Sequence, residues 1–325
     1  MTIKKILIIA FFLIGSQAVF IAPISAQQVT LSLDPPIVQA KIKPGKAIIV
    51  AYTVENLGDP TNLQFLIRPF APIGELGSLA PLPQMEGPVQ FNLENADVEM
   101  EKPFFFPSKE KKQAVVRIQV PLGVPDGDYY YLVLAETVPA FSVGGQSTGV
   151  ASASIGAPLL ISITDSGITE VKTTIADFSF IPDYILTIGN NTVRIVDNAK
   201  ALPVTCSVRN MGKNLVQPQG TITDQNGSQK RIYSLIPQNV LSSSQRILKV
   251  DSGEDTLSSN TTLSLSALSI GAHTLTAQIS YGENTPIQFK SLTFVALPLR
   301  LMIAVLFLCI CLSVFFLVRF LQRRN

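Results

Sequence analysis

The carboxylates that could bind a cation or act as acid and base gather in two short stretches. They are Glu94, Asp97, Glu99 and Glu101 in the first stretch, and Asp126 and Asp128 in the second. A calcium site needs several oxygens that converge at about 2.3 to 2.6 Å, and the D-x-D-x-D-G pattern of a calcium loop is absent. The Asp-Gly-Asp triplet is typical of a turn, so calcium is the minor alternative and we predict no metal or cofactor.

Hydrolytic chemistry has little support in the sequence. Paired carboxylates can cleave a glycosidic bond, but the aromatic platform of a sugar-binding cleft is not evident, and the chain has no tryptophan. His273 is the single histidine, and no spacing around it suggests the oriented partners of a Ser-His-Asp or Cys-His mechanism. We predict that the protein is not an enzyme, with a surface hydrolase as a minor alternative.

The position of His273 favours a structural role. It follows Gly271 by two residues, as Tyr129 follows Gly127, and it lies on the inward face of its predicted strand with Leu275. Tyr129 is a candidate tyrosine corner, in which the hydroxyl bonds to nearby backbone. We expect His273 to fill the same role with a ring nitrogen.

The elements between Gln27 and Pro298 are predicted to be strands. Alternation with period two runs through residues 48–55, 114–120 and 274–281, so each of these strands has one inward apolar face. Turn residues such as Pro and Gly at 44–45 and Asn and Gly at 226–227 give the rhythm of antiparallel sandwiches. The exported part is therefore expected to be all-β.

An internal repeat indicates two domains. The sequence VENLG at 54–58 matches VRNMG at 208–212, and each closes a predicted strand. The strands opened by Gly127 and Gly271 follow at similar intervals, which is the pattern of one fold used twice. We divide the exported chain into two tandem immunoglobulin-like β-sandwiches, a membrane-distal one at 27–166 and a membrane-proximal one at 167–297.

Both ends of the chain indicate a membrane protein. Residues 1–26 combine two lysines, an apolar stretch and a small-residue cleavage site, which are the features of a secretory signal peptide. Leu301–Val318 is uncharged and nearly spans a hydrocarbon core of about 30 Å. We assign residues 298–318 to a transmembrane helix and 319–325 to a tail. An uncleaved signal anchor is the weaker alternative, because its apolar stretch is shorter than the roughly 20 residues a span needs.

Arginines on the two sides of the predicted helix set its orientation. One lies before the helix and three follow it: Arg300, then Arg319, Arg323 and Arg324. The excess of positive charge beyond the helix places the C-terminus in the cytoplasm. We predict a single-pass type I protein of the cell membrane, with an extracellular ectodomain.

Charge and cysteine content further limit the partners of the protein and the kind of cell surface it belongs to. The exported part is mildly acidic, because six of the 25 basic residues belong to the two ends, and this argues against a nucleic-acid partner. Two of the three cysteines lie in the predicted helix, so no disulfide can form within the ectodomain. Immunoglobulin-type domains of animal cell surfaces usually carry such a bridge, and its absence favours a bacterial surface.

Two segments are candidates for recognition. Residues 69–88 are rich in proline and glycine and carry an apolar load that solvated loops usually lack. Its apolar members are Phe70, Ile73, Leu76, Leu79, Leu82 and Met85. The segment either covers an open edge of the sandwich or meets a partner. The uncharged stretch 137–148, which contains Phe141, is the second candidate.

The second half of the chain resembles a known family. The stretch Asn239 to Arg246, together with Gly271, Tyr281 and Gly282, is similar to the C-terminal domain of the bacterial WxL-interacting proteins. The signal peptide, two sandwiches, single helix and short basic tail also resemble that family. The resemblance implies a surface protein that holds a secreted protein or peptidoglycan.

The topology predicts a membrane-anchored extracellular scaffold that captures a secreted protein or cell-wall polymer at the bacterial surface. The alternative is an accessory subunit of a membrane complex, in which the helix packs against partner helices through Cys309, Cys311 and Ser313. The scaffold needs only an anchor, whereas the accessory subunit needs this particular helix.

Overall fold

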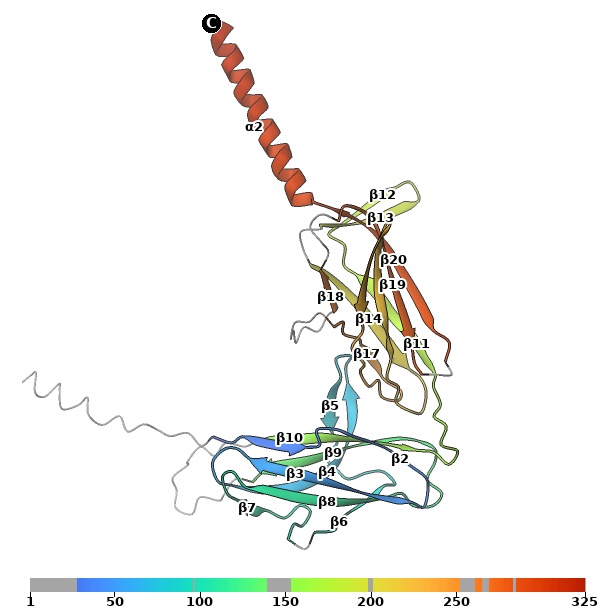
Figure 1. The fold of residues 1–325 in the computed structure, drawn as a ribbon. Coiled ribbons are helices and arrows are strands. Elements are labelled where there is room, and N and C mark those ends of the chain that lie inside the picture. Colours follow the sequence, from blue (N-terminus) through green and yellow to red (C-terminus); the bar gives the residue numbers. More distant parts are fainter. Residues whose placement is uncertain are drawn as a thin grey trace, which may run out of the picture.

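The computed structural model describes residues 28–95, 97–138, 153–197, 201–251, 261–264, 269–282 and 285–324. The predicted signal peptide and Phe141 lie outside the described residues. Strands dominate the described part, and one apolar helix follows them (Figure 1). The predicted fold class is therefore confirmed.

The first sandwich is built from strands between residues 31 and 163. These are β1 (Leu31–Asp34), β2 (Val38–Ile42), β3 (Ala47–Asn56), β4 (Thr61–Ile73), β5 (Ser78–Pro81), β6 (Gln90–Leu93), β7 (Phe104–Phe106), β8 (Lys111–Gln119), β9 (Gly127–Thr137) and β10 (Ser154–Ile163). One sheet has the order β1-β3-β8-β6, and the other has the order β2-β10-β9-β4-β5, with β7 also pairing with β4. Strands β2 and β10 run parallel.

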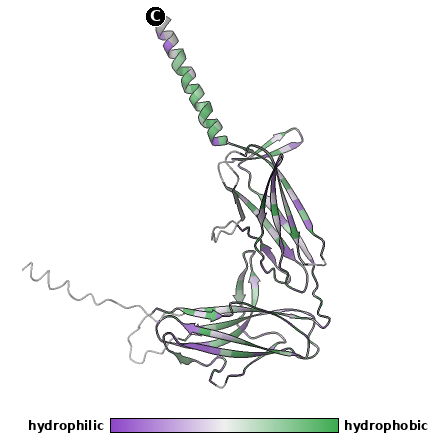
Figure 2. Ribbon diagram, in the orientation of Figure 1, coloured by the Kyte–Doolittle hydropathy of each residue, from purple (hydrophilic) through white to green (hydrophobic). Residues whose placement is uncertain are grey.

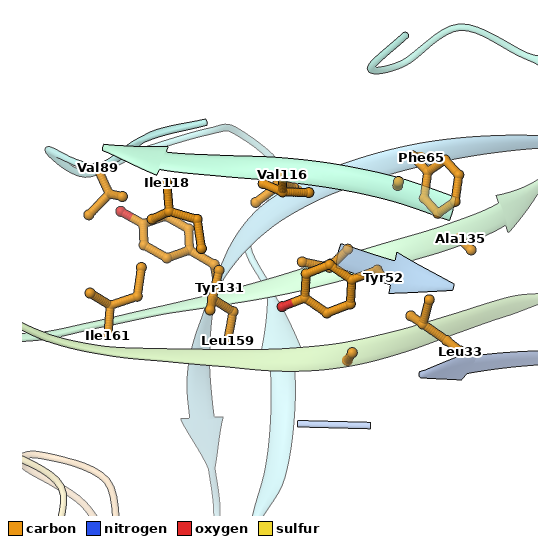
Figure 3. Close-up of a cluster of buried hydrophobic side chains, with 14 of the residues drawn as sticks. Leu33, Tyr52, Phe65, Val89, Val116, Ile118, Tyr131, Ala135, Leu159 and Ile161 are labelled. Atoms are coloured by element: carbon orange, nitrogen blue, oxygen red, sulfur yellow. The ribbon is translucent and has the colours of Figure 1, made fainter. Parts of the chain in front are cut away.

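Side chains from both sheets fill the space between them. Tyr52 on β3 and Ile118 on β8 are fully buried, while their strand neighbours point outward, as the period-two pattern predicts. Figure 3 shows the rings of Tyr52 and Tyr131 among aliphatic side chains such as Val116 and Leu159. A fully buried side chain of this size contributes roughly 1.5 to 3 kcal/mol, and this half of the chain has no cysteine. Apolar packing therefore holds this sandwich together.

The second sandwich is built from strands between residues 173 and 297. These are β11 (Thr173–Phe180), β12 (Tyr184–Ile188), β13 (Asn191–Asp197), β14 (Ala201–Asn210), β15 (Gln219–Asn226), β16 (Gln229–Ser234), β17 (Gln245–Ile247), β18 (Thr261–Ser264), β19 (Gly271–Ser280) and β20 (Gln288–Leu297). One sheet has the order β11-β14-β17, with β18 also pairing with β14, and the other has the order β12-β13-β20-β19-β15-β16.

The predicted repeat falls at matching places in the two sandwiches. Strand β3 ends at Asn56 and strand β14 ends at Asn210, and both asparagines are buried. Cys206 of β14 is buried and free, and burial raises the pKa of its thiol to about 12. It packs in the core as a small apolar residue. The precise domain limits, 27–166 and 167–297, remain predictions.

The helix that ends the chain is α2 (Leu299–Arg324). Its 19 residues Leu299–Leu317 have a mean hydropathy of 2.7 and none of them is buried by the protein. In Figure 2 the ribbon of this helix has the colour of hydrophobic residues for most of its length, and the helix stands clear of both sandwiches. The helix is long and apolar enough to cross a membrane.

Candidate functional site

The segment at 69–88 forms a hairpin that joins the two sandwiches. Strand β5 pairs with the end of β4, and Figure 1 shows this β4–β5 hairpin standing out of the first sandwich toward β17. At its tip the carbonyl oxygen of Glu75 accepts a hydrogen bond from the amide of Ile247 at 2.8 Å, and its carboxylate accepts one from Gln245 Nε2 at 3.0 Å. The hairpin therefore binds the second sandwich of its own chain.

An apolar cluster lies at the base of this hairpin, on the outer face of the first sandwich. It contains side chains of β4, β9 and β10 together with one leucine of the second sandwich: Leu66, Phe70, Leu132, Leu134, Leu160 and Leu241. The ring of Tyr130 stacks on that of Phe70 with centroids 5.7 Å apart. Because both faces of this sheet are covered, β9 is buried at five successive residues.

A polar network surrounds Asp128 at the same interface. Its carboxylate accepts hydrogen bonds from Asn214 Nδ2 at 2.7 Å and from the amide of Leu215 at 2.5 Å. The hydroxyl of Tyr130 donates to Asp128 at 2.9 Å and accepts from the amide of Ser242 at 2.8 Å. Burial, and then the charge of Asp128, raise the pKa of Tyr130. The network fixes loops of the second sandwich on the first.

A pocket of about 390 Å³ lies between the hairpin and the second sandwich. Its apolar walls come from both sandwiches and include Phe70, Leu79, Leu160 and Leu241. Its polar lining comes from one stretch of the second sandwich that includes Gln238, Asn239 and Arg246. This combination of apolar walls and a few polar groups is typical of ligand sites.

Arg246 is the charged group of this pocket. Its Nη1 donates to the carbonyl oxygen of Asn239 at 2.7 Å. Its guanidinium lies beside Gly77, where a Cβ would come within 2.4 Å of Nη2 and would displace the guanidinium. Gly77 also has a φ of +84°, which glycine tolerates best. Burial lowers the pKa of Arg246, and within the described residues it forms no ion pair.

Three buried polar atoms of the pocket-lining residues have no hydrogen-bond partner within the described part of the chain. They are Gln238 Oε1, Asn239 Oδ1 and Arg246 Nε. A buried polar atom without a partner costs about 1 to 3 kcal/mol. The set offers two acceptors and one donor.

The predicted apolar residues of the hairpin segment differ in their burial. Phe70 is buried in the interdomain cluster and Leu79 packs against it. Ile73, Leu76 and Met85 are about half exposed, with exposed fractions of 54%, 50% and 43%. Leu82 is partly buried, and its amide donates to the carbonyl oxygen of Pro69. The segment thus meets the second sandwich and still leaves apolar side chains in solvent.

Met85 lines a second cavity, of about 420 Å³, on the first sandwich. Its other walls include Phe91, Met100 and the ion pair of Arg68 Nη1 with Glu101 Oε1 at 2.7 Å. Because Arg68 already forms an ion pair with Glu101, the charged group of this cavity is less available to a ligand than Arg246 of the interdomain pocket.

The two residues of the predicted structural corner make different bonds. The hydroxyl of Tyr129 donates to the carbonyl oxygen of Pro125 at 3.4 Å, which is the contact of a tyrosine corner. His273 instead bonds to side chains: Nδ1 to Asp224 at 2.8 Å, and Nε2 to Asn226 and Ser269, each at 3.0 Å. The expected backbone contact of the imidazole is therefore wrong, because these polar side chains surround the ring.

Hydrogen bonds join Asp224 to His273 and His273 to Ser269, which is the arrangement of acid, imidazole and hydroxyl in a hydrolytic triad. All three are buried, with exposed fractions of 3%, 1% and 6%, and neither cavity described above is lined by them. The ring of His273 also stacks on Phe294 at 5.0 Å. A substrate carbonyl needs access to the serine hydroxyl, so this buried arrangement serves to join the β15–β16 turn to the start of β19.

The acidic stretch at 94–101 forms ion pairs rather than a converging set of oxygens. Each carboxylate has a different cationic partner: Glu94 with Arg117, Asp97 with Lys112, Glu99 with Lys102, and Glu101 with Arg68. Within the described residues, no three His, Cys, Asp or Glu side chains are grouped as metal ligands would be. Asp128 of the second stretch acts at the domain interface.

Sequence reasoning missed the residues that make this interface. It assigns Asp128 to a turn and gives no role to Glu75 or Tyr130. A usable signal exists in β9, where residues 131–135 are all apolar or aromatic and therefore predict a strand covered on both faces. The stretch 239–246, on which the family resemblance depends, lies at the pocket.

Several solved structures resemble this chain. They include chains of the Salmonella enterica SafA pilin–SafB chaperone complex (11% identity, TM-score 0.36, covering 82% of this chain and 99% of that one), the Acinetobacter baumannii CsuC–CsuE chaperone–tip adhesion subunit complex (11%, 0.35, 83% and 99%) and the Pseudomonas aeruginosa CupB2 chaperone (12%, 0.33, 81% and 100%). No protein-family model and no curated protein matches the sequence. At these values the resemblance carries no functional conclusion.

Proposed function

We propose that the protein is a membrane-anchored extracellular binding protein that captures a secreted protein at the bacterial surface. The observation that carries this proposal is the interdomain pocket, with its apolar walls and with Arg246, which forms no ion pair within the described residues. Three buried polar atoms of the lining residues also have no hydrogen-bond partner within the described part of the chain. A purely structural interface between two sandwiches would gain stability by pairing these atoms.

The polar atoms of the pocket favour a peptide segment over a wall polymer. Gln238 and Asn239 line the pocket with amide side chains, which can both donate and accept hydrogen bonds, and Arg246 lines it with a donor-only guanidinium. A peptide backbone offers N–H and C=O groups side by side, and its apolar side chains fit walls such as Leu79 and Leu241. Peptidoglycan is the second ligand class, and the family resemblance of the stretch 239–246 includes both.

The helix supplies the anchor in this proposal. Its 26 residues extend about 39 Å at 1.5 Å per residue. Arg300 at its start pairs with the buried carboxylate of Asp197, with Nε and Oδ2 3.3 Å apart. In the sequence, three arginines at 319, 323 and 324 follow the apolar stretch and only Arg300 precedes it, which supports a cytoplasmic C-terminus and a type I orientation.

Co-sedimentation of the full-length protein in nanodiscs with cell walls of its own source tests this proposal. We expect the protein to pellet with protein-bearing walls and to remain in solution with walls stripped of protein. Pelleting with stripped walls would indicate polymer binding. Failure to pellet with either would contradict the proposal.

The variant Arg246→Ala identifies the site in this assay. It should reduce pelleting at least tenfold, because it removes the pocket's only cation among the described lining residues. Arg117→Ala is the matched control, since it removes an arginine from the surface of the first sandwich. Thermal unfolding of both variants separates lost binding from lost folding.

The membrane-complex alternative depends on the helix itself. Ser313 Oγ donates to the carbonyl oxygen of Cys309 at 2.8 Å, so its hydroxyl is already used within the helix. This contact weakens its predicted role between helices. Replacing residues 299–317 by an unrelated apolar helix should leave wall binding unchanged; loss of function in that chimera would favour the accessory subunit.

A further inference from the structure

The hairpin of β12 and β13 exposes apolar side chains where a soluble domain would carry polar ones. All five residues of β12 are exposed, and the large apolar ones are Tyr184, Ile185, Leu186 and Ile188, with exposed fractions of 59%, 64%, 47% and 64%. Ile181, just before the strand, is 79% exposed. Residues 184–193 contain no charge, and the exposed Arg194 follows them, opposite Ile185. Such a patch marks an interaction surface.

The exposed residues cover both faces of this hairpin. Side chains alternate along a strand, so Tyr184, Leu186 and Ile188 point to one side and Ile185 to the other. The partner strand adds Thr192, which is also exposed. A protein groove would cover one face, whereas a fluid apolar medium covers both.

The hairpin lies at the end of the second sandwich from which α2 leaves. Strand β13 pairs with the last three residues of β20, where Asp197 lies opposite Leu297, and the helix begins two residues later at Leu299. Figure 1 shows β12 and β13 beside the start of the helix. The carboxylate of Asp197 also forms an ion pair with Arg300 in the first turn of the helix. The backbone amide of Asp197 donates a hydrogen bond to Asp183 Oδ2 at 2.8 Å, at the base of the hairpin.

We infer that the β12–β13 hairpin lies in the outer interface of the bilayer as a second membrane contact. Its apolar side chains enter the headgroup and acyl boundary, and Tyr184 takes the position that interfacial tyrosines prefer. The contacts among Asp183, Asp197 and Arg300 tie the hairpin to the helix. The second sandwich is therefore held to the membrane at two places, which restricts its tilt. This inference rests on the anchoring part of the proposed function.

Single tryptophans test this inference, because the natural chain has none. The full-length variants Ile185→Trp, Phe307→Trp and Phe105→Trp are placed in nanodiscs of phosphatidylcholine and phosphatidylglycerol, with and without brominated acyl chains. Phe307 lies within α2, and Phe105 is an exposed residue of β7 in the first sandwich. Emission wavelength and quenching by bromine report on contact with lipid.

We expect blue-shifted emission and at least twofold quenching for Ile185→Trp and Phe307→Trp, and neither for Phe105→Trp. Quenching of Phe307→Trp without quenching of Ile185→Trp would overturn the inference and leave the anchor intact. A blue shift of Ile185→Trp without quenching would also overturn it and would indicate contact with a second copy of the chain. No quenching of Phe307→Trp would remove the anchor itself.

Discussion

The two sandwiches close the same strand with the same asparagine turn, yet only one of these turns takes part in the domain interface. In both, the side-chain oxygen accepts from the glycine two residues later, at 3.0 Å for Asn56 and Gly58 and 2.9 Å for Asn210 and Gly212. In both, the side-chain nitrogen donates to a backbone carbonyl just beyond the strand, that of Asp59 or Asn214, and to backbone carbonyls that are remote in sequence. The two asparagine turns therefore have the same local hydrogen-bond pattern.

The difference lies in what the turn itself contacts. Asn56 bonds to the carbonyl oxygens of Phe106 and Pro107 within the first sandwich. Asn210 bonds to that of Asn214, whose own side chain donates to Asp128 across the interface. The comparison teaches that a repeated fold element can keep its stabilising role and also acquire a connecting one.

The largest expected effect is that of removing either asparagine. Asn56→Ala and Asn210→Ala each leave several buried carbonyl groups unpaired, so each should lower the free energy of unfolding of its sandwich by about 3 kcal/mol. Calorimetry of the full-length protein measures this. Asn92→Ala, on the exposed part of β6, is the control and should have little effect. If Asn210→Ala left the interface bond of Asn214 intact, the proposed connection would be wrong.

Removing Asp128 should separate the connecting role of the second asparagine turn from the stabilising role that both turns share. Asp128→Ala deletes the acceptor of Asn214 and Leu215 and should cost about 2 kcal/mol, without weakening the turn at Asn56. Hydrogen exchange of the Leu215 amide, which is bonded to Asp128, should accelerate at least tenfold. Asp126→Ala is the control, because its carboxylate accepts an exposed hydrogen bond from the amide of Asp165. If the Leu215 amide exchanged at the same rate in the Asp128→Ala and Asp126→Ala variants, the role of Asp128 at the interface would be contradicted.

The smallest effect is expected from alkaline pH. The folded interface keeps the phenol of Tyr130 protonated by raising its pKa above an unfolded value of about 10. Its stabilising contribution is complete below that pH and declines as pH rises above it. Tyr130→Phe should therefore show a shallower loss of thermal stability between about pH 10 and 12 than the natural chain. Tyr52 and Tyr131 remain in both proteins, so parallel curves would mean that Tyr130 is not coupled to the interface.

Much of the fold could be predicted from the sequence, and little of the site. The period-two pattern around Tyr52 and Ile118 identifies the inward faces, because alternation follows from strand geometry alone. The pocket could not be predicted in this way. Arg246 lies against Gly77 only because the hairpin of one sandwich reaches a loop of the other, and no local pattern encodes that distance.

The sequence by itself determined the elements whose causes are local: strands, the repeated asparagine turns and an apolar helix, which the sequence placed at 298–318 and the structure at Leu299–Arg324. Only the tertiary structure decided that the segment 69–88 spans between sandwiches, that His273 bonds to Asp224, and that the β12–β13 hairpin lies beside the helix. The physical reason is that hydropathy and backbone preference act over a few residues, whereas pockets and interfaces depend on how remote segments pack.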